Sequence, residues 1–188
     1  MDYILQMEKM FKFLEFNLET DKLLVLNKLK RKFSNDLNLL GCFIKDYLII
    51  KTSGFVPDDN EIYDEFIMFF EKQKDKNEII DEILRYSKYY LMLVFEESDN
   101  EFCLNLICVI NSCFSMEYFP SVIKLFDDYY YCKKIDGNTF LRVVKLLSDN
   151  VIQRFELENA LPLSFLEIEQ LINSIISKNS MEYERLIS

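Results

Sequence analysis

Carboxylates are the side chains of this chain best suited to chemistry, because the chain has no histidine. Acidic doublets occur at four places: Asp58-Asp59, Asp64-Glu65, Glu96-Glu97 and Asp127-Asp128. Carboxylate oxygens suit Mg²⁺, but neighbouring residues on a helix point about 100° apart, so a doublet rarely forms one metal site. We therefore interpret the doublets as solvated faces and expect neither a metal site nor a catalytic residue.

The absence of histidine also excludes several classes of active site. His-Asp pairs, Cys-His pairs and the general base of an HNH nuclease all need an imidazole. Three glycines, without a G-x-G-x-x-G pattern or a Walker lysine, cannot build a loop that cradles phosphate. We expect a non-catalytic protein without a cofactor, and we rank a Mg²⁺-dependent enzyme that uses carboxylates last.

Cysteine usage and hydropathy bear on the compartment. The five cysteines stand at 42, 103, 108, 113 and 132 without a C-x-x-C pair, as suits buried thiols in a reducing cytoplasm. No apolar run reaches the roughly 18 residues of a membrane span, and the N-terminus lacks a basic region before an apolar core. The sequence therefore predicts a cytoplasmic protein that does not enter a membrane.

The elements that must position these side chains are helices. Only three glycines and three prolines interrupt the 188 residues, half of which are hydrophobic. Apolar residues recur at three or four positions in long stretches, for example Phe102, Leu106, Val109, Ile110 and Cys113. The sequence predicts an all-α fold, a single irregular domain of about eight or nine helices over residues 2–178, with a frayed polar tail at 179–188.

The segment 37–51 is apolar on most sides, which is typical of a central helix. The clearest loop follows it at 52–60, and Asp59 or Asn60 is the expected cap of the next helix. For the helix after Gly137 the expected cap is Asn138 or Thr139.

The formal charge of −10 argues against direct binding to nucleic acid or to an anionic membrane. One basic group is a weak candidate for phosphate contact: Lys28, Lys30, Arg31 and Lys32. These residues fall at the end of the second predicted helix, where cations are favourable. We interpret them mainly as a solvated helix end.

A run of aromatic residues gives the best candidate for an interaction surface. Tyr129, Tyr130 and Tyr131 are consecutive, so they cannot all face one core, and at least one should reach solvent or a partner. We add Arg154 to this candidate surface. As the last residue of its expected helix, it is interpreted mainly as a C-terminal cation or as a member of an inter-helix salt bridge.

Several short motifs occur in a recognisable order. They are Cys42-Phe43-Ile44-Lys45-Asp46-Tyr47-Leu48-Ile49, Ile62-Tyr63-Asp64-Glu65-Phe66, Ile83-Leu84-Arg85-Tyr86-Ser87-Lys88-Tyr89-Tyr90, Tyr118-Phe119-Pro120-Ser121-Val122-Ile123-Lys124-Leu125 and Gln153-Arg154. In this order they resemble the helical part of GmrSD-type restriction proteins, over roughly residues 37–165. In that family the last position is usually two arginines. The helical part there follows a ParB-like nucleotide-dependent domain and precedes an HNH nuclease domain.

The resemblance implies a helical scaffold in modification-dependent restriction of foreign DNA, without catalysis of its own. Neither the HNH motif nor the "D-G-Q-Q-R" type motif of the nucleotide domain occurs here. The expected partner is therefore a nuclease or ParB-like domain supplied elsewhere, which would make this chain part of a larger restriction enzyme. The alternative is a small acidic immunity or anti-defence protein that binds a basic toxin or nuclease through its charge. Homo-oligomerisation is left open.

Overall fold

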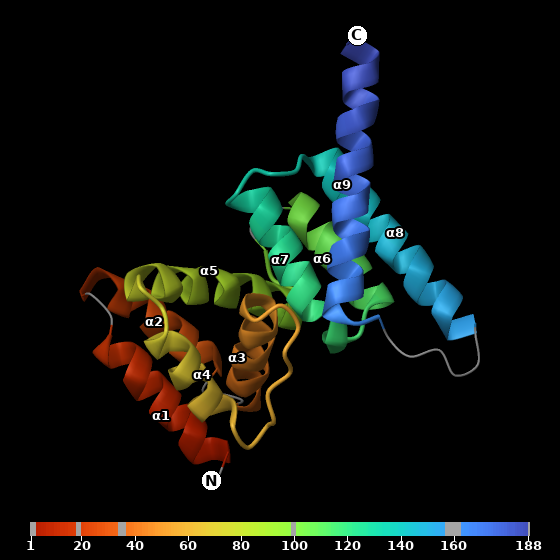
Figure 1. Cartoon of the computed structure of the whole chain (residues 1–188). Coiled ribbons are helices and arrows are strands. Elements are labelled where there is room, and N and C mark those ends of the chain that lie inside the picture. Colours follow the sequence, from red (N-terminus) through yellow and green to blue (C-terminus); the bar gives the residue numbers. More distant parts are fainter. Residues whose placement is uncertain (1–2, 18–19, 34–36, 99–100, 157–162, 188) are drawn as a thin grey trace. The chain divides into compact units, whose positions relative to one another are not determined.

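The computed structural model describes residues 3–17, 20–33, 37–98, 101–156 and 163–187 (Figure 1). Within these ranges the chain forms nine α-helices, one short 3-10 helix and no strand. The all-α fold with eight or nine helices is therefore confirmed. The helices are α1 (Tyr3–Phe16), α2 (Thr20–Phe33), α3 (Leu37–Lys51), α4 (Ile62–Glu71), α5 (Lys76–Phe95), α6 (Glu101–Cys113), η1 (Met116–Tyr118), α7 (Phe119–Tyr130), α8 (Gly137–Glu156) and α9 (Phe165–Ile187).

The contacts between residues group the chain into two compact units. Unit 1, residues 1–95, contains α1 to α5, and unit 2, residues 96–188, contains α6 to α9 with η1. α9 continues to Ile187, over the segment that we expect from the sequence to fray. No glycine or proline follows Pro162, so nothing in the sequence interrupts that helix.

α3 is the central helix of unit 1, as its all-round apolar sequence predicts. It contacts α1, α2, α4 and α5. Its buried side chains include Leu40, Phe43, Ile44, Tyr47 and Leu48. The Phe43 ring stacks on Phe33 of α2, with centroids 5.9 Å apart, and lies 5.5 Å from the Tyr90 ring of α5. These rings join three helices in one aromatic core.

The N-terminus of α4 is held by a distant residue. Its N-cap position is Glu61, which makes no side-chain cap bond, so the cap that we expect at Asp59 or Asn60 is wrong. The buried Gln6 of α1 accepts a hydrogen bond from the Tyr63 N–H at 3.3 Å. Its amide also donates to the carbonyl of Asn60 at 3.0 Å. One glutamine thus satisfies two polar backbone groups at this helix start.

Unit 2 is built around α7 and α8. α7 contacts α8 and α9, and α8 also contacts α6 and α9. Pro120 lies in the first turn of α7, where its missing N–H costs little. α8 is capped by Asp136, whose carboxylate accepts the Thr139 N–H at 2.7 Å, so the expected cap at Asn138 or Thr139 is also wrong.

Replacement of Phe43 by alanine tests the aromatic core of unit 1. The ring is 1% exposed, so Phe43→Ala should lower the free energy of unfolding by about 3 to 5 kcal/mol in urea titrations. Phe16 is a matched control because its ring is 91% exposed, and Phe16→Ala should change stability by less than about 0.5 kcal/mol. Equal effects of the two substitutions would contradict the central position of α3.

Candidate functional site

The tyrosine run lies at the end of α7, and its three members have different environments. The Tyr130 ring stacks on Phe126 with an interplanar angle of 12°, and its hydroxyl contacts the buried Cys103 thiol. The Tyr129 ring packs against Phe140 of α8, with centroids 5.2 Å apart. Tyr131 is 63% exposed. The expectation that at least one of the three reaches solvent is therefore confirmed.

The backbone that carries Tyr131 is fixed by hydrogen bonds to the last turn of α7. The N–H groups of Tyr131 and Cys132 both donate to the carbonyl of Asp127, at 3.0 and 2.9 Å. The Lys134 N–H donates to the carbonyl of Asp128 at 2.9 Å. Lys133 between them has φ 53°, a left-handed conformation that a lysine adopts only when its surroundings impose it. We call residues 131–134 the tyrosine turn.

The carboxylates of Asp127 and Asp128 are buried, so our interpretation of this doublet as a solvated face is wrong. Asp128 forms ion pairs with Lys124 at 3.3 Å and with Lys134 at 3.0 Å. Lys124 also pairs with Glu169 of α9 at 2.8 Å. Buried carboxylates are tolerated where cations and donors compensate them. This network links the tyrosine turn to α7 and α9.

The ionisation of the same groups supports a tightly paired network. The hydrogen bond to Asp128 raises the pKa of Lys134 above its ordinary value. Burial alone would lower the pKa of Lys124, but the hydrogen bond and charge of Glu169 and the charge of Asp128 raise it overall. Burial, followed by the charge of Asp127, raises the pKa of the Cys132 thiol. The lysines therefore stay charged, and the thiol stays protonated, near neutral pH.

Arg154 lies on α8, but its side chain falls outside the part of the structure that is described. Its membership of the interaction surface stays a prediction. Of the tyrosines, Tyr131 is the one whose ring is mainly in solvent, and Lys133 and Lys134 beside it are also exposed. The candidate surface therefore consists of an exposed aromatic ring next to two lysines.

The basic group of α2 occupies the end of that helix, as predicted, but two of its members are already engaged. Lys30 forms an ion pair with Glu15 of α1 at 2.6 Å and lies 5.6 Å from the Phe11 ring. Lys32 lies over the Phe95 ring at 5.4 Å. Lys28, Arg31 and Lys32 are exposed. A contact of this group with phosphate stays a prediction, with three exposed cations to carry it.

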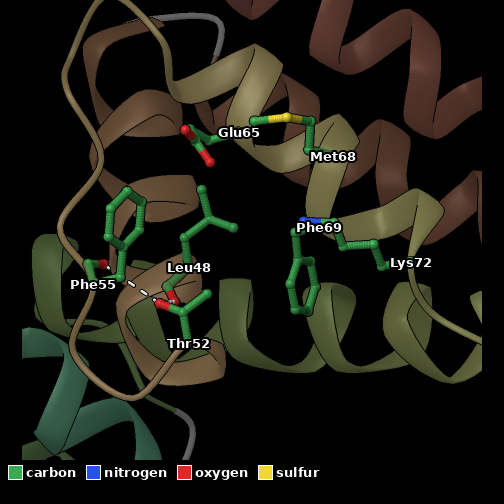
Figure 2. A pocket seen from close by; sticks show the side chains of 7 residues that line it. All are labelled: Leu48, Thr52, Phe55, Glu65, Met68, Phe69 and Lys72. Atoms are coloured by element: carbon green, nitrogen blue, oxygen red, sulfur yellow. Dashed lines mark hydrogen bonds between the residues drawn. The ribbon is translucent and has the colours of Figure 1, made fainter.

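Unit 1 contains a pocket that the sequence does not reveal (Figure 2). It has a volume of about 210 Å³ and lies between the end of α3, the loop after it and α4. Leu48 comes from α3, Thr52 and Phe55 from the loop after it, and Glu65, Met68, Phe69 and Lys72 from α4 and the residue after it. Phe55 and Met68 are 51% and 48% exposed, so this face is apolar as well as open.

Contacts behind the pocket hold its walls in place. The Phe69 ring meets Tyr47 edge-on, and the Tyr47 hydroxyl donates to Glu82 of α5 at 3.2 Å. Lys51 pairs with the same carboxylate at 2.7 Å. The Thr52 hydroxyl donates to the carbonyls of Leu48 and Phe55, at 2.6 and 3.5 Å, which ties the loop to the helix. The pocket is therefore preformed.

The tyrosine turn and the pocket of unit 1 are two surface features of the described residues. No group of three or more metal-ligating side chains occurs among them. None of the described helices is long and apolar enough to cross a membrane. A sequence signal for the pocket is Phe55, an aromatic residue inside the clearest loop of the chain.

Comparison of the chain with protein-family models, with curated proteins and with solved structures finds no match.

The cap of α8 allows a test with a pH signature. Hydrogen bonds from the backbone, first of all from Thr139, lower the pKa of Asp136. Because its pKa is lower in the folded state, the Asp136 carboxylate stabilises the fold fully above the ordinary aspartate pKa of about 3.9. This stabilisation is lost as pH falls through the pKa of Asp136 in the folded state. Asp136→Ala should lower the free energy of unfolding at neutral pH by about 0.5 to 2 kcal/mol.

Urea unfolding at several pH values measures this effect. The difference between the wild type and Asp136→Ala should shrink below about pH 4, where the carboxylate becomes protonated. Asp136→Asn keeps an oxygen acceptor without the charge, so its stability relative to Asp136→Ala should not depend on pH. A difference between wild type and Asp136→Ala that is constant down to pH 3 would contradict the role of the charge.

Proposed function

We propose that this chain is a non-catalytic helical scaffold that binds a protein partner through the tyrosine turn. The observation that carries the proposal is the 63% exposure of Tyr131 on a backbone fixed by hydrogen bonds to α7. Interfaces are enriched in tyrosine, and binding energy often concentrates in a few aromatic anchors. A fixed turn loses little conformational entropy on binding, which favours affinity.

The order of the sequence motifs supports a place for this scaffold among GmrSD-type restriction proteins. The tyrosine turn falls between the motif at 118–125 and the helix that ends in Gln153-Arg154. In that setting the chain joins or orients a nucleotide-dependent domain and a nuclease domain, and the wider activity is modification-dependent restriction of DNA. The charge of −10 favours contact with these proteins over contact with the DNA itself.

A second candidate function is inhibition of a basic toxin or nuclease. The specific observation is the distribution of charge, because residues 96–188 contain 15 acidic and 8 basic residues, a net charge of −7 of the total −10. A surface of one sign accelerates association with a partner of the opposite sign and helps to select it. In this case binding should weaken steeply as salt rises.

Affinity capture from the native host, with the chain as bait and identification by mass spectrometry, tests the proposal. We expect recovery of a ParB-like or HNH nuclease protein. Loss of the Tyr131 ring in Tyr131→Ala should weaken the binding of the recovered partner by at least about tenfold, since a truncated anchor typically costs 2 kcal/mol or more. Binding is then measured with the purified pair by calorimetry.

Phe16→Ala removes an aromatic ring that is still more exposed, but in unit 1, and is the control. It should leave the affinity unchanged, and both variants should keep the thermal stability of the wild type. Full binding by Tyr131→Ala would overturn the role of the tyrosine turn. Capture of a basic toxin, with strongly salt-dependent binding, would instead favour the inhibitor.

A further inference from the structure

The face of α4 that borders the pocket carries an acid, an apolar residue and a base in order. Glu65, Met68 and Lys72 are spaced by three and four residues, so they follow one side of the helix over about 10 Å. Among the described residues, neither Glu65 nor Lys72 has an ion-pair partner. Both charged groups therefore border an exposed apolar patch without compensation.

The size of the pocket restricts what can occupy it. Its 210 Å³ lies below the roughly 300 to 1,000 Å³ of typical small-molecule sites. It suits one or two side chains inserted from a protein surface, with the exposed Phe55 and Met68 as an apolar rim. The walls are fixed by the contacts of Phe69 and Thr52, so insertion would not require the pocket to form first.

We propose that this face binds the same face of a second copy of the chain, with the two α4 helices antiparallel. A two-fold axis that crosses α4 between Met68 and Phe69 brings Glu65 of each copy opposite Lys72 of the other. The same axis brings each Met68 against the Phe69 ring and the pocket of the other copy. Methionine packs favourably on aromatic rings, so one axis matches both the charges and the apolar contacts.

Self-complementarity is the reason to choose a second copy over an unrelated partner. A two-fold interface requires that a patch match itself when inverted, and the order acid, apolar, base on one helix meets this requirement. The charge of unit 1 also permits it. Residues 1–95 contain 17 acidic and 14 basic residues, a net charge of only −3, so repulsion between two copies is small.

Reversal of single charges tests the pairing by sedimentation equilibrium over a wide range of concentration. The wild-type chain should show a reversible monomer–dimer equilibrium. In a dimer of Glu65→Lys, the new lysine of each copy lies opposite Lys72 of the other copy. In a dimer of Lys72→Glu, the new glutamate of each copy lies opposite Glu65 of the other copy. Each variant should weaken dimerisation by about 100-fold or more, because like charges in an interface cost several kcal/mol.

A mixture of the two variants separates the proposal from misfolding. In a heterodimer of Glu65→Lys with Lys72→Glu, the two lysines of one copy face the two glutamates of the other. The equimolar mixture should therefore dimerise within about tenfold of the wild type, although each variant alone stays monomeric. Asp64→Lys and Lys74→Glu make the same changes of charge at exposed positions away from the face and should leave dimerisation unchanged.

A wild-type chain that stays monomeric at every soluble concentration overturns the proposal and leaves the pocket to another occupant. A mixture of the two variants that stays monomeric also overturns it, as does a dimer that survives both single substitutions. The α4 face and the tyrosine turn share no residue, so we expect Tyr131→Ala to dimerise like the wild type. Failure of either proposal is thus measured separately from the other.

Discussion

The burial of most of α3 is the constraint on which unit 1 depends. A helix that is apolar on most sides must be covered by several neighbours, and α1, α2, α4 and α5 supply that cover. The aromatic residues on α3 fix those neighbours, since Phe43 meets both α2 and α5, and Tyr47 meets Phe69 of α4. Where α3 ends, the pocket opens between Leu48, Thr52 and α4.

Unit 2 depends on a different interaction, the compensation of buried carboxylates. Asp127 and Asp128 sit in the last turn of α7, where negative charge is unfavourable to the helix as well as costly to bury. Lys124 and Lys134 compensate Asp128, and the backbone carbonyls of both aspartates bind the chain that follows. The arrangement that neutralises the acids therefore also fixes the direction in which Tyr131 leaves the helix.

Helical periodicity and the scarcity of glycine and proline predict most of the described fold, because both signals are local. The central place of α3 and the exposure of one tyrosine also follow from local sequence. The helix caps do not follow from local sequence. The N-terminus of α4 is held by Gln6, which lies 57 residues before the N–H that it accepts. α8 is capped by Asp136 and not by Asn138 or Thr139, because Asp136 directly precedes Gly137, the first residue of the helix. Lys134 and Lys124 compensate the buried Asp128, and Lys124 also pairs with Glu169 of α9; composition cannot reveal these contacts.

The two proposed surfaces would reinforce each other if both are used. The tyrosine turn lies in unit 2 and the α4 face in unit 1, so neither surface competes with the other for the same residues. A dimer formed through α4 carries two tyrosine turns. A partner with two matching sites would then bind the second turn intramolecularly, and its overall affinity would rise without any new contact, provided that the spacing allows both to engage. Weak self-association can therefore affect the affinity of a scaffold for its partner.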